Sequence, residues 1–151
     1  MFYKNQILSL ACAIVFLAPA AITDDLSVEA KITLAESGGP ASISSKAMIM
    51  DTDGTMLREG SNGWTCMPGV SLIPGDNHPM CNDATWVRFF KAAASGEPFS
   101  TEIMGYSYML MGDALINNDN PAATDPNDGG NWVQEGPHLM LLFPTVDDLK
   151  G

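Results

Sequence analysis

The sequence predicts an α+β domain: a small antiparallel sheet with two packed helices and an irregular, disulfide-tied loop. Three observations predict it. Residues 24–36 and 84–95 place apolar side chains at helical spacing, between capping residues and glycine. Short apolar runs bounded by turn residues predict strands at 47–50, 56–59, 103–111 and 139–143. Two cysteines enclose a segment rich in proline and glycine, which predicts the tied loop.

Residues 1–21 have the features of a bacterial signal peptide. Lys4 supplies the positive start, an apolar run follows, and the small residues at 18–21 offer a cleavage site. The run is well short of the ~20 residues of a membrane-spanning helix. The alternatives are an uncleaved anchor and lipid attachment at Cys12. We therefore expect a secreted or periplasmic protein whose single domain covers residues 22–151.

The domain is strongly acidic. The whole chain has a net charge of −11, and removal of the signal, whose only charged side chain is Lys4, leaves −12. Such a surface repels phosphate backbones and anionic lipids, which argues against nucleic-acid and membrane partners after signal cleavage. Composition also excludes disorder, since 46% of the residues are hydrophobic and three are tryptophan. We expect a monomer that binds a small ligand or a protein and has no cofactor.

Cys66 and Cys81 are the only cysteines after the signal, and we expect them to form a disulfide. The 14 residues between them include three prolines and two glycines, which disfavours a regular helix or strand. A bridge across a loop of this size stabilises a fold by about 3 kcal/mol. The alternatives are a redox pair, which usually has C-x-x-C spacing, and a metal site, which needs more ligands.

The first half of the domain predicts a helix followed by a hairpin. Thr23 can cap the helix at 24–36, and a Gly-Gly-Pro sequence ends it. The strand at 47–50 turns through residues 51–54 into the strand at 56–59, because Asp-Gly between apolar runs is typical of hairpins.

The second half predicts another helix and two strands. Asn82 or Asp83 caps the helix at 84–95, and Gly96 ends it. Its expected buried stripe consists of Trp86, Phe89, Phe90 and Ala93.

The last part of the chain alternates strand and loop. Residues 103–111 have a bulky aromatic face and a small face, as in a strand that another layer covers closely on one side. Residues 112–130 predict a long structureless loop before the strand at 139–143. A capping pattern at 145–148, just before the chain ends, predicts the start of a further helix. We expect a C-terminal truncation, and the alternative is a single frayed turn that ends the protein.

The sharpest motif is an apolar strand followed by Asp51-Thr-Asp53-Gly-Thr, which resembles the first motif of haloacid dehalogenase-type phosphatases. The resemblance implies that Asp51 is the nucleophile beside Mg²⁺ and that Asp53 is the general acid and base. Lys91 or Arg88 would then steady the phosphate. The competing interpretation is a hairpin turn that happens to have this sequence.

A second hypothesis is a soft-metal site. His78 and Met80 form one His-x-Met element, and His138 and Met140 form another. Imidazole and thioether ligands suit Cu(I), whereas methionine as core filler is the competing interpretation. A calcium loop that starts at Asp51 fails, because the required glycine and final glutamate are absent.

The chain also resembles an uncharacterised family of small secreted bacterial proteins. The strings that carry this resemblance are Asn-Gly-Trp-Thr-Cys-Met-Pro, Pro-Met-Cys, Ser-Tyr-Met-Leu and Gly-Pro-His-Leu-Met, within residues 41–144. It implies no particular activity. It does imply a turn at 51–55 and a further segment beyond the end of this chain.

We expect a non-catalytic binding or interaction domain, with a phosphatase and a copper-binding protein as alternatives. The expected ligand-binding surface consists of Trp64, His78, Trp132 and His138, with the loop at 112–130 beside it. Aromatic rings and imidazoles in irregular segments are common contact residues, which is the reason for this choice.

Overall fold

The computed structural model describes residues 26–70, 76–120, 123 and 125–144. The helices are α1 (Val28–Ser37), α2 (Ala41–Ser44), α3 (Ala84–Ser95) and a 3₁₀ helix, η1 (Pro126–Asp128). The strands are β1 (Met48–Met50), β2 (Met56–Arg58), β3 (Thr65–Met67), β4 (Met80–Asn82), β5 (Gly105–Met109), β6 (Ile116–Asn117), β7 (Trp132–Val133) and β8 (His138–Leu142). The predicted signal peptide, the cap at Thr23 and the pattern at 145–148 lie outside these residues.

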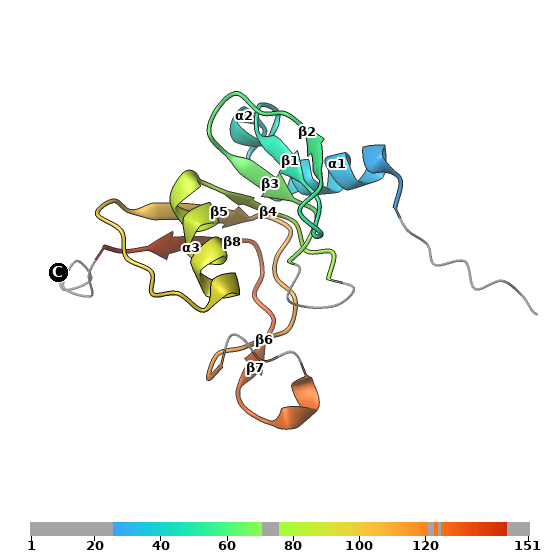
Figure 1. Ribbon diagram of the computed structural model, residues 1–151. Helices are drawn as coiled ribbons and strands as arrows, with labels where there is room; N and C mark the ends of the chain where they lie inside the picture. Colours follow the sequence, from blue (N-terminus) through green and yellow to red (C-terminus); the bar gives the residue numbers. More distant parts are fainter. Residues whose placement is uncertain (1–25, 71–75, 121–122, 124, 145–151) are drawn as a thin grey trace, which may run out of the picture.

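The architecture is mixed α and β, with a mostly antiparallel sheet (Figure 1). The sheet has six strands in the order β2-β1-β3-β4-β5-β8, so the expectation of a small sheet is wrong. All neighbours are antiparallel except β1 and β3, which are parallel. Strands β6 and β7 form a separate two-stranded sheet. None of the helices in the described ranges is long and apolar enough to cross a membrane.

Helix α1 starts later than the sequence suggests. Its N-cap is Ser27, whose hydroxyl accepts a hydrogen bond from the Ala30 N–H at 3.2 Å, rather than Thr23. Its C-cap is Gly38, which has a right-handed φ of −68°. Glycine is required there by proximity, because a Cβ would lie 2.7 Å from backbone atoms of Pro79 and Met80.

Strands β1 and β2 form the expected hairpin. The Asp51 N–H donates to the Thr55 carbonyl at 2.8 Å, and Gly54 has the positive φ of 88° that the turn requires. The hairpin is irregular, because the register shifts between Ile49 and Met50. The Met48 N–H donates to the Trp64 carbonyl, which begins the parallel pairing of β1 with β3.

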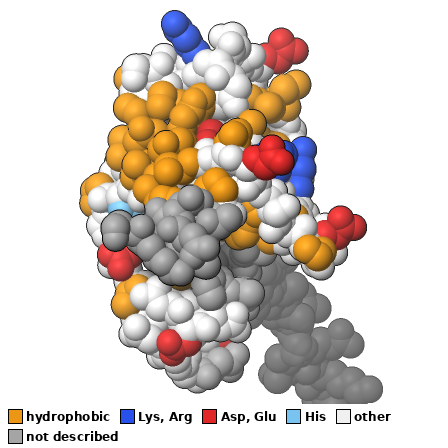
Figure 2. Space-filling model, turned by 90° about the vertical axis from the view of Figure 1, so that its left-hand side faces the viewer, with side chains coloured by type: hydrophobic (Ala, Val, Ile, Leu, Met, Phe, Trp, Pro, Cys, Tyr) orange, Lys and Arg blue, Asp and Glu red, His pale blue; other side chains and the backbone are white. Residues whose placement is uncertain are grey.

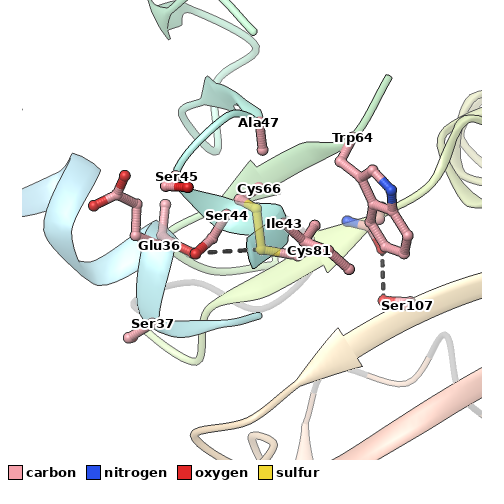
Figure 3. Close-up of a disulfide and its surroundings, with 12 residues drawn as sticks. Glu36, Ser37, Ile43, Ser44, Ser45, Ala47, Trp64, Cys66, Cys81 and Ser107 are labelled. Carbon is pink, nitrogen blue, oxygen red and sulfur yellow. Dashed lines mark hydrogen bonds between the residues drawn. A yellow bond between two sulfur atoms is a disulfide. The ribbon is translucent and has the colours of Figure 1, made fainter. Parts of the chain in front are cut away.

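Cys66 and Cys81 form the predicted disulfide. They lie directly opposite each other on β3 and β4, with 4.0 Å between their Cα atoms (Figure 3). Met67 and Met80 also pair in this ladder, so the expectation that both lie in an irregular loop is wrong. The disulfide is fully buried among apolar side chains of the core, which include Ala35, Ala47 and Ile49.

The sheet has two differently covered faces. The α1 face contains Ile49, Cys66, Cys81 and Tyr108, and a Cβ on Gly39 would lie 2.8 Å from the Cys81 sulfur. The α3 face contains the side chains that alternate with these along each strand, and α3 packs on it at β4 and β5 (Figure 1). The small face predicted for 103–111 is the one that α3 covers.

Helix α3 is tied to the sheet at its first turn. Asp83 is the cap: one carboxylate oxygen accepts from the Trp86 N–H and the other from the Tyr106 N–H, each at 2.9 Å. Gly96 ends the helix with a φ of 69°. Trp86 is buried and packs against Phe89 and Phe90, but Ala93 is exposed rather than buried as predicted.

The loop predicted at 112–130 contains regular structure. Residues 116–117 pair with 132–133, and η1 lies between these strands. Asn117 holds the connection together: its Oδ1 accepts from two backbone N–H groups, and its Nδ2 donates to the Gly129 carbonyl at 3.1 Å.

The contact between Gly39 and the disulfide gives a prediction. Gly39→Ala is expected to lower the free energy of unfolding by about 1–3 kcal/mol, because the new methyl group overlaps the bridge. Urea unfolding of the oxidised protein measures this. Gly136→Ala is the control, since no atom lies within 4 Å of a Cβ there, and it should change stability by less than about 0.5 kcal/mol. Equal effects of the two substitutions would contradict the packing argument.

Candidate functional site

A cavity of about 410 Å³ lies between α3 and the α3 face of β1, β3 and β4. Its apolar lining is Met50, Met67, Val70, Met80, Val87, Phe90, Ala93 and Ala94, and its polar lining is Asp51, Thr52, Asp53, Gly54 and Lys91. The polar residues belong to the β1–β2 turn and to one position of α3. The cavity therefore has an apolar body and a polar end.

Three methionines form the floor of this cavity. Met67 and Met80 lie directly opposite each other on β3 and β4, and Met50 lies on the same face of β1. Unbranched thioether side chains adapt to ligands of different shape, which is why methionine is frequent on binding surfaces. In the sequence they look like core filler. For Met67 and Met80, the signal that could have indicated them is their position immediately after Cys66 and immediately before Cys81.

The roof of the cavity is formed by α3. The bulky rings of Trp86, Phe89 and Phe99 pack together, with Phe89 and Phe99 centroids 5.5 Å apart. The next turn presents the small side chains of Ala93 and Ala94 to the cavity. Because these side chains are short, they do not fill the space above the methionines.

The polar end contains two aspartates, one buried and one exposed. Asp51 is buried, and its Oδ2 lies 2.9 Å from the Lys31 Nζ, so an ion pair compensates its charge. Asp53 is exposed and accepts the Thr55 N–H at 2.8 Å, and this hydrogen bond lowers the pKa of the Asp53 carboxyl. Asp53 is therefore ionised at neutral pH and available to a polar group of a ligand.

The phosphatase hypothesis places catalytic residues at the same turn. Asp51, Asp53 and Lys91 do line one cavity, whereas the Arg88 guanidinium lies 3.4 Å from the Thr101 hydroxyl. One observation counts against it. The sheet is mostly antiparallel, whereas such phosphatases need parallel strands with crossover helices. Within the described residues, no group of three or more His, Cys, Asp or Glu side chains that could hold a metal ion is found.

His78 and His138 are both near Asp113. Burial raises the pKa of the Asp113 carboxyl, while electrostatic interactions with His138 and His78 oppose this shift and the charge of Asp76 adds to it. The Asp76 side chain is fully buried and lies 2.7 Å from the His78 Nδ1. The four side chains belong to the segments before β4, after β5 and at the start of β8.

The surface expected from the sequence does not form as one patch. The Trp64 ring lies on the α1 face, with its centroid 5.7 Å from that of Tyr108. Trp132 lies on β7, in the separate two-stranded sheet at the bottom of Figure 1. Its Nε1 donates to the Gly129 carbonyl at 2.7 Å. Only His78 and His138 share a neighbourhood.

The copper hypothesis stays a prediction. Met80 lies in the floor of the cavity, and Met140 lies opposite Ser107 on the α3 face of β8. The ring nitrogen Nδ1 of His138 lies 2.7 Å from the Gly136 carbonyl oxygen, as His78 Nδ1 does from Asp76.

Comparison of the chain with models of protein families, with curated proteins and with solved structures finds no match.

Proposed function

We propose that the protein is an exported binding domain that takes a small, largely apolar ligand in the cavity between α3 and the sheet. The observation that supports this best is the cavity's lining, in which apolar side chains from three strands and one helix surround about 410 Å³. Ligand sites typically have volumes of about 300–1,000 Å³, are mostly apolar, and contain few polar groups.

The cavity is open to solvent on its α3 side, where Ala93 and Ala94 are exposed. Larger side chains at these positions would cover more of its apolar wall and bury more apolar surface. Two alanines stand on α3 where leucine or phenylalanine would close the space, and the floor is three flexible methionines. Small residues on the helix and flexible methionines on the sheet suit a site that adapts to the shape of its ligand.

The polar end would orient the guest. The ionised Asp53 carboxylate and the Lys91 ammonium both line this end. The Asp51 carboxylate forms an ion pair with Lys31. A ligand with an apolar body and a compact polar head would bury the body over the methionines. Its head would lie beside the β1–β2 turn.

The proposal of export rests on two features. The first 21 residues have the pattern of a signal peptide, and the mature domain contains a buried disulfide. Disulfides persist in oxidising compartments and are rare in the cytoplasm. A secreted or periplasmic location follows from both.

Filling the cavity tests the proposal. Ala94→Trp is expected to weaken binding of the neutral apolar fluorophore N-phenyl-1-naphthylamine at least about tenfold, because the indole occupies the ligand's space. Ser95→Trp is the matched control, because Ser95 is the next residue of the helix, is exposed and does not line the cavity. Fluorescence titration measures both. Equal affinity in the wild type and in Ala94→Trp would exclude this cavity as the site.

A phosphatase is the second candidate, because Asp51, Asp53 and Lys91 line one cavity. If it is correct, hydrolysis of p-nitrophenyl phosphate in the presence of Mg²⁺ should fall at least about 100-fold in Asp51→Asn. Circular dichroism of the Asp51→Asn variant must show an unchanged fold, because this substitution also weakens the ion pair between position 51 and Lys31. No difference between wild type and variant would eliminate the candidate.

A further inference from the structure

The two edges of the sheet are protected very differently. Strand β2 is three residues long, ends at the charged Arg58, and is distorted by the register shift in β1. These are devices that prevent a sheet edge from pairing with another chain. Strand β8 has none of them: it is five residues long, contains no Lys, Arg, Asp, Glu or Pro, and pairs with β5 without a register shift. Within the described residues, its outer backbone groups make no hydrogen bond to another element.

An exposed apolar surface adjoins this free edge. On the α1 face, Leu139 and Leu141 of β8 lie opposite Tyr108 and Tyr106 of β5. The leucines are 44% and 40% exposed, and Tyr106 is 39% exposed. Figure 2 shows apolar side chains gathered on this side of the molecule, which is at the left in Figure 1, where β8 ends. Apolar patches that continue to a free strand edge are typical of interaction surfaces.

We propose that β8 pairs with β8 of a second copy of the chain, in an antiparallel two-fold arrangement. A two-fold axis at Met140 would place Leu139 of one copy opposite Leu141 of the other, on the α1 face of both sheets. His138 would lie opposite Leu142 on the α3 face. The strand is thus complementary to itself, and the joined sheets would have twelve strands.

The distribution of charged residues permits a second copy to approach this edge. Two mature chains, each with a net charge of −12 after Lys4 is lost with the signal, repel each other wherever carboxylates face one another. Strands β5 and β8 contain no Lys, Arg, Asp or Glu, so pairing at β8 does not bring carboxylates of the two copies together. This dimer departs from the monomer expected from the sequence, and it does not depend on the ligand cavity, which lies at the other end of the sheet.

Sedimentation over a range of concentrations tests the dimer. The protein of residues 22–151 is expected to dimerise, and Leu141→Lys should raise the dissociation constant at least about tenfold, because two lysines would face leucines in the joined sheet. Met56→Lys is the matched control, because Met56 is also exposed on an edge strand, namely β2 at the other end of the sheet. Its substitution should leave dimerisation unchanged. Hydrogen exchange should show that the β8 amides gain protection as the concentration of the wild type rises.

Two results would overturn the proposal. The first is a wild type that sediments as a monomer at every concentration. If such a monomer dimerises when the chain is shortened to end at Pro144, residues 145–151 of the same chain are the occupant of the edge. The second is a dimer that persists in Leu141→Lys, which would place the interface elsewhere.

Discussion

The pairing of β3 with β4 across the Cys66–Cys81 disulfide is the contact on which the rest of the fold depends. These are the two central strands of the sheet, and every other strand of that sheet is added to one side or the other of this pair. The disulfide also defines the α1 face, because Gly38 and Gly39 bring the end of α1 against β4 and the sulfur of Cys81. Two glycines are needed here because a side chain would overlap the strand or the bridge.

The two faces of the sheet have different consequences for binding. On the α1 face, the helix and the disulfide cover the centre but leave the leucines of β8 exposed. On the α3 face, the helix is fixed by Asp83 at its first turn, and the alanines of its last turns lie over Met67 and Met80. A cavity therefore forms over one half of the sheet, and an apolar surface remains over the other half. The proposed ligand site and the proposed dimer surface both follow from how far α3 and α1 extend over the strands.

Local patterns predicted the local structure of this chain. Asp53-Gly54 predicted the hairpin, and Asp83 was one of two expected caps, because each depends on hydrogen bonds between neighbouring residues. The parallel pairing of β1 with β3 was not predicted, since it joins segments separated by a hairpin and a loop. The cavity was missed for a related reason: Met50 and Met67 approach each other only through that pairing, and methionine has no spacing signal that distinguishes a pocket from a core.

Hydrogen exchange of the Cys66→Ala/Cys81→Ala double variant tests most directly whether the disulfide organises the fold. If it does, the amides of α1, β1, β3 and β4 should lose protection together, with a loss of about 3 kcal/mol in unfolding free energy. If protection is lost only between the two cysteine positions, while α1 and β1 keep theirs, the bridge merely ties a loop. That result would contradict the central place given to it.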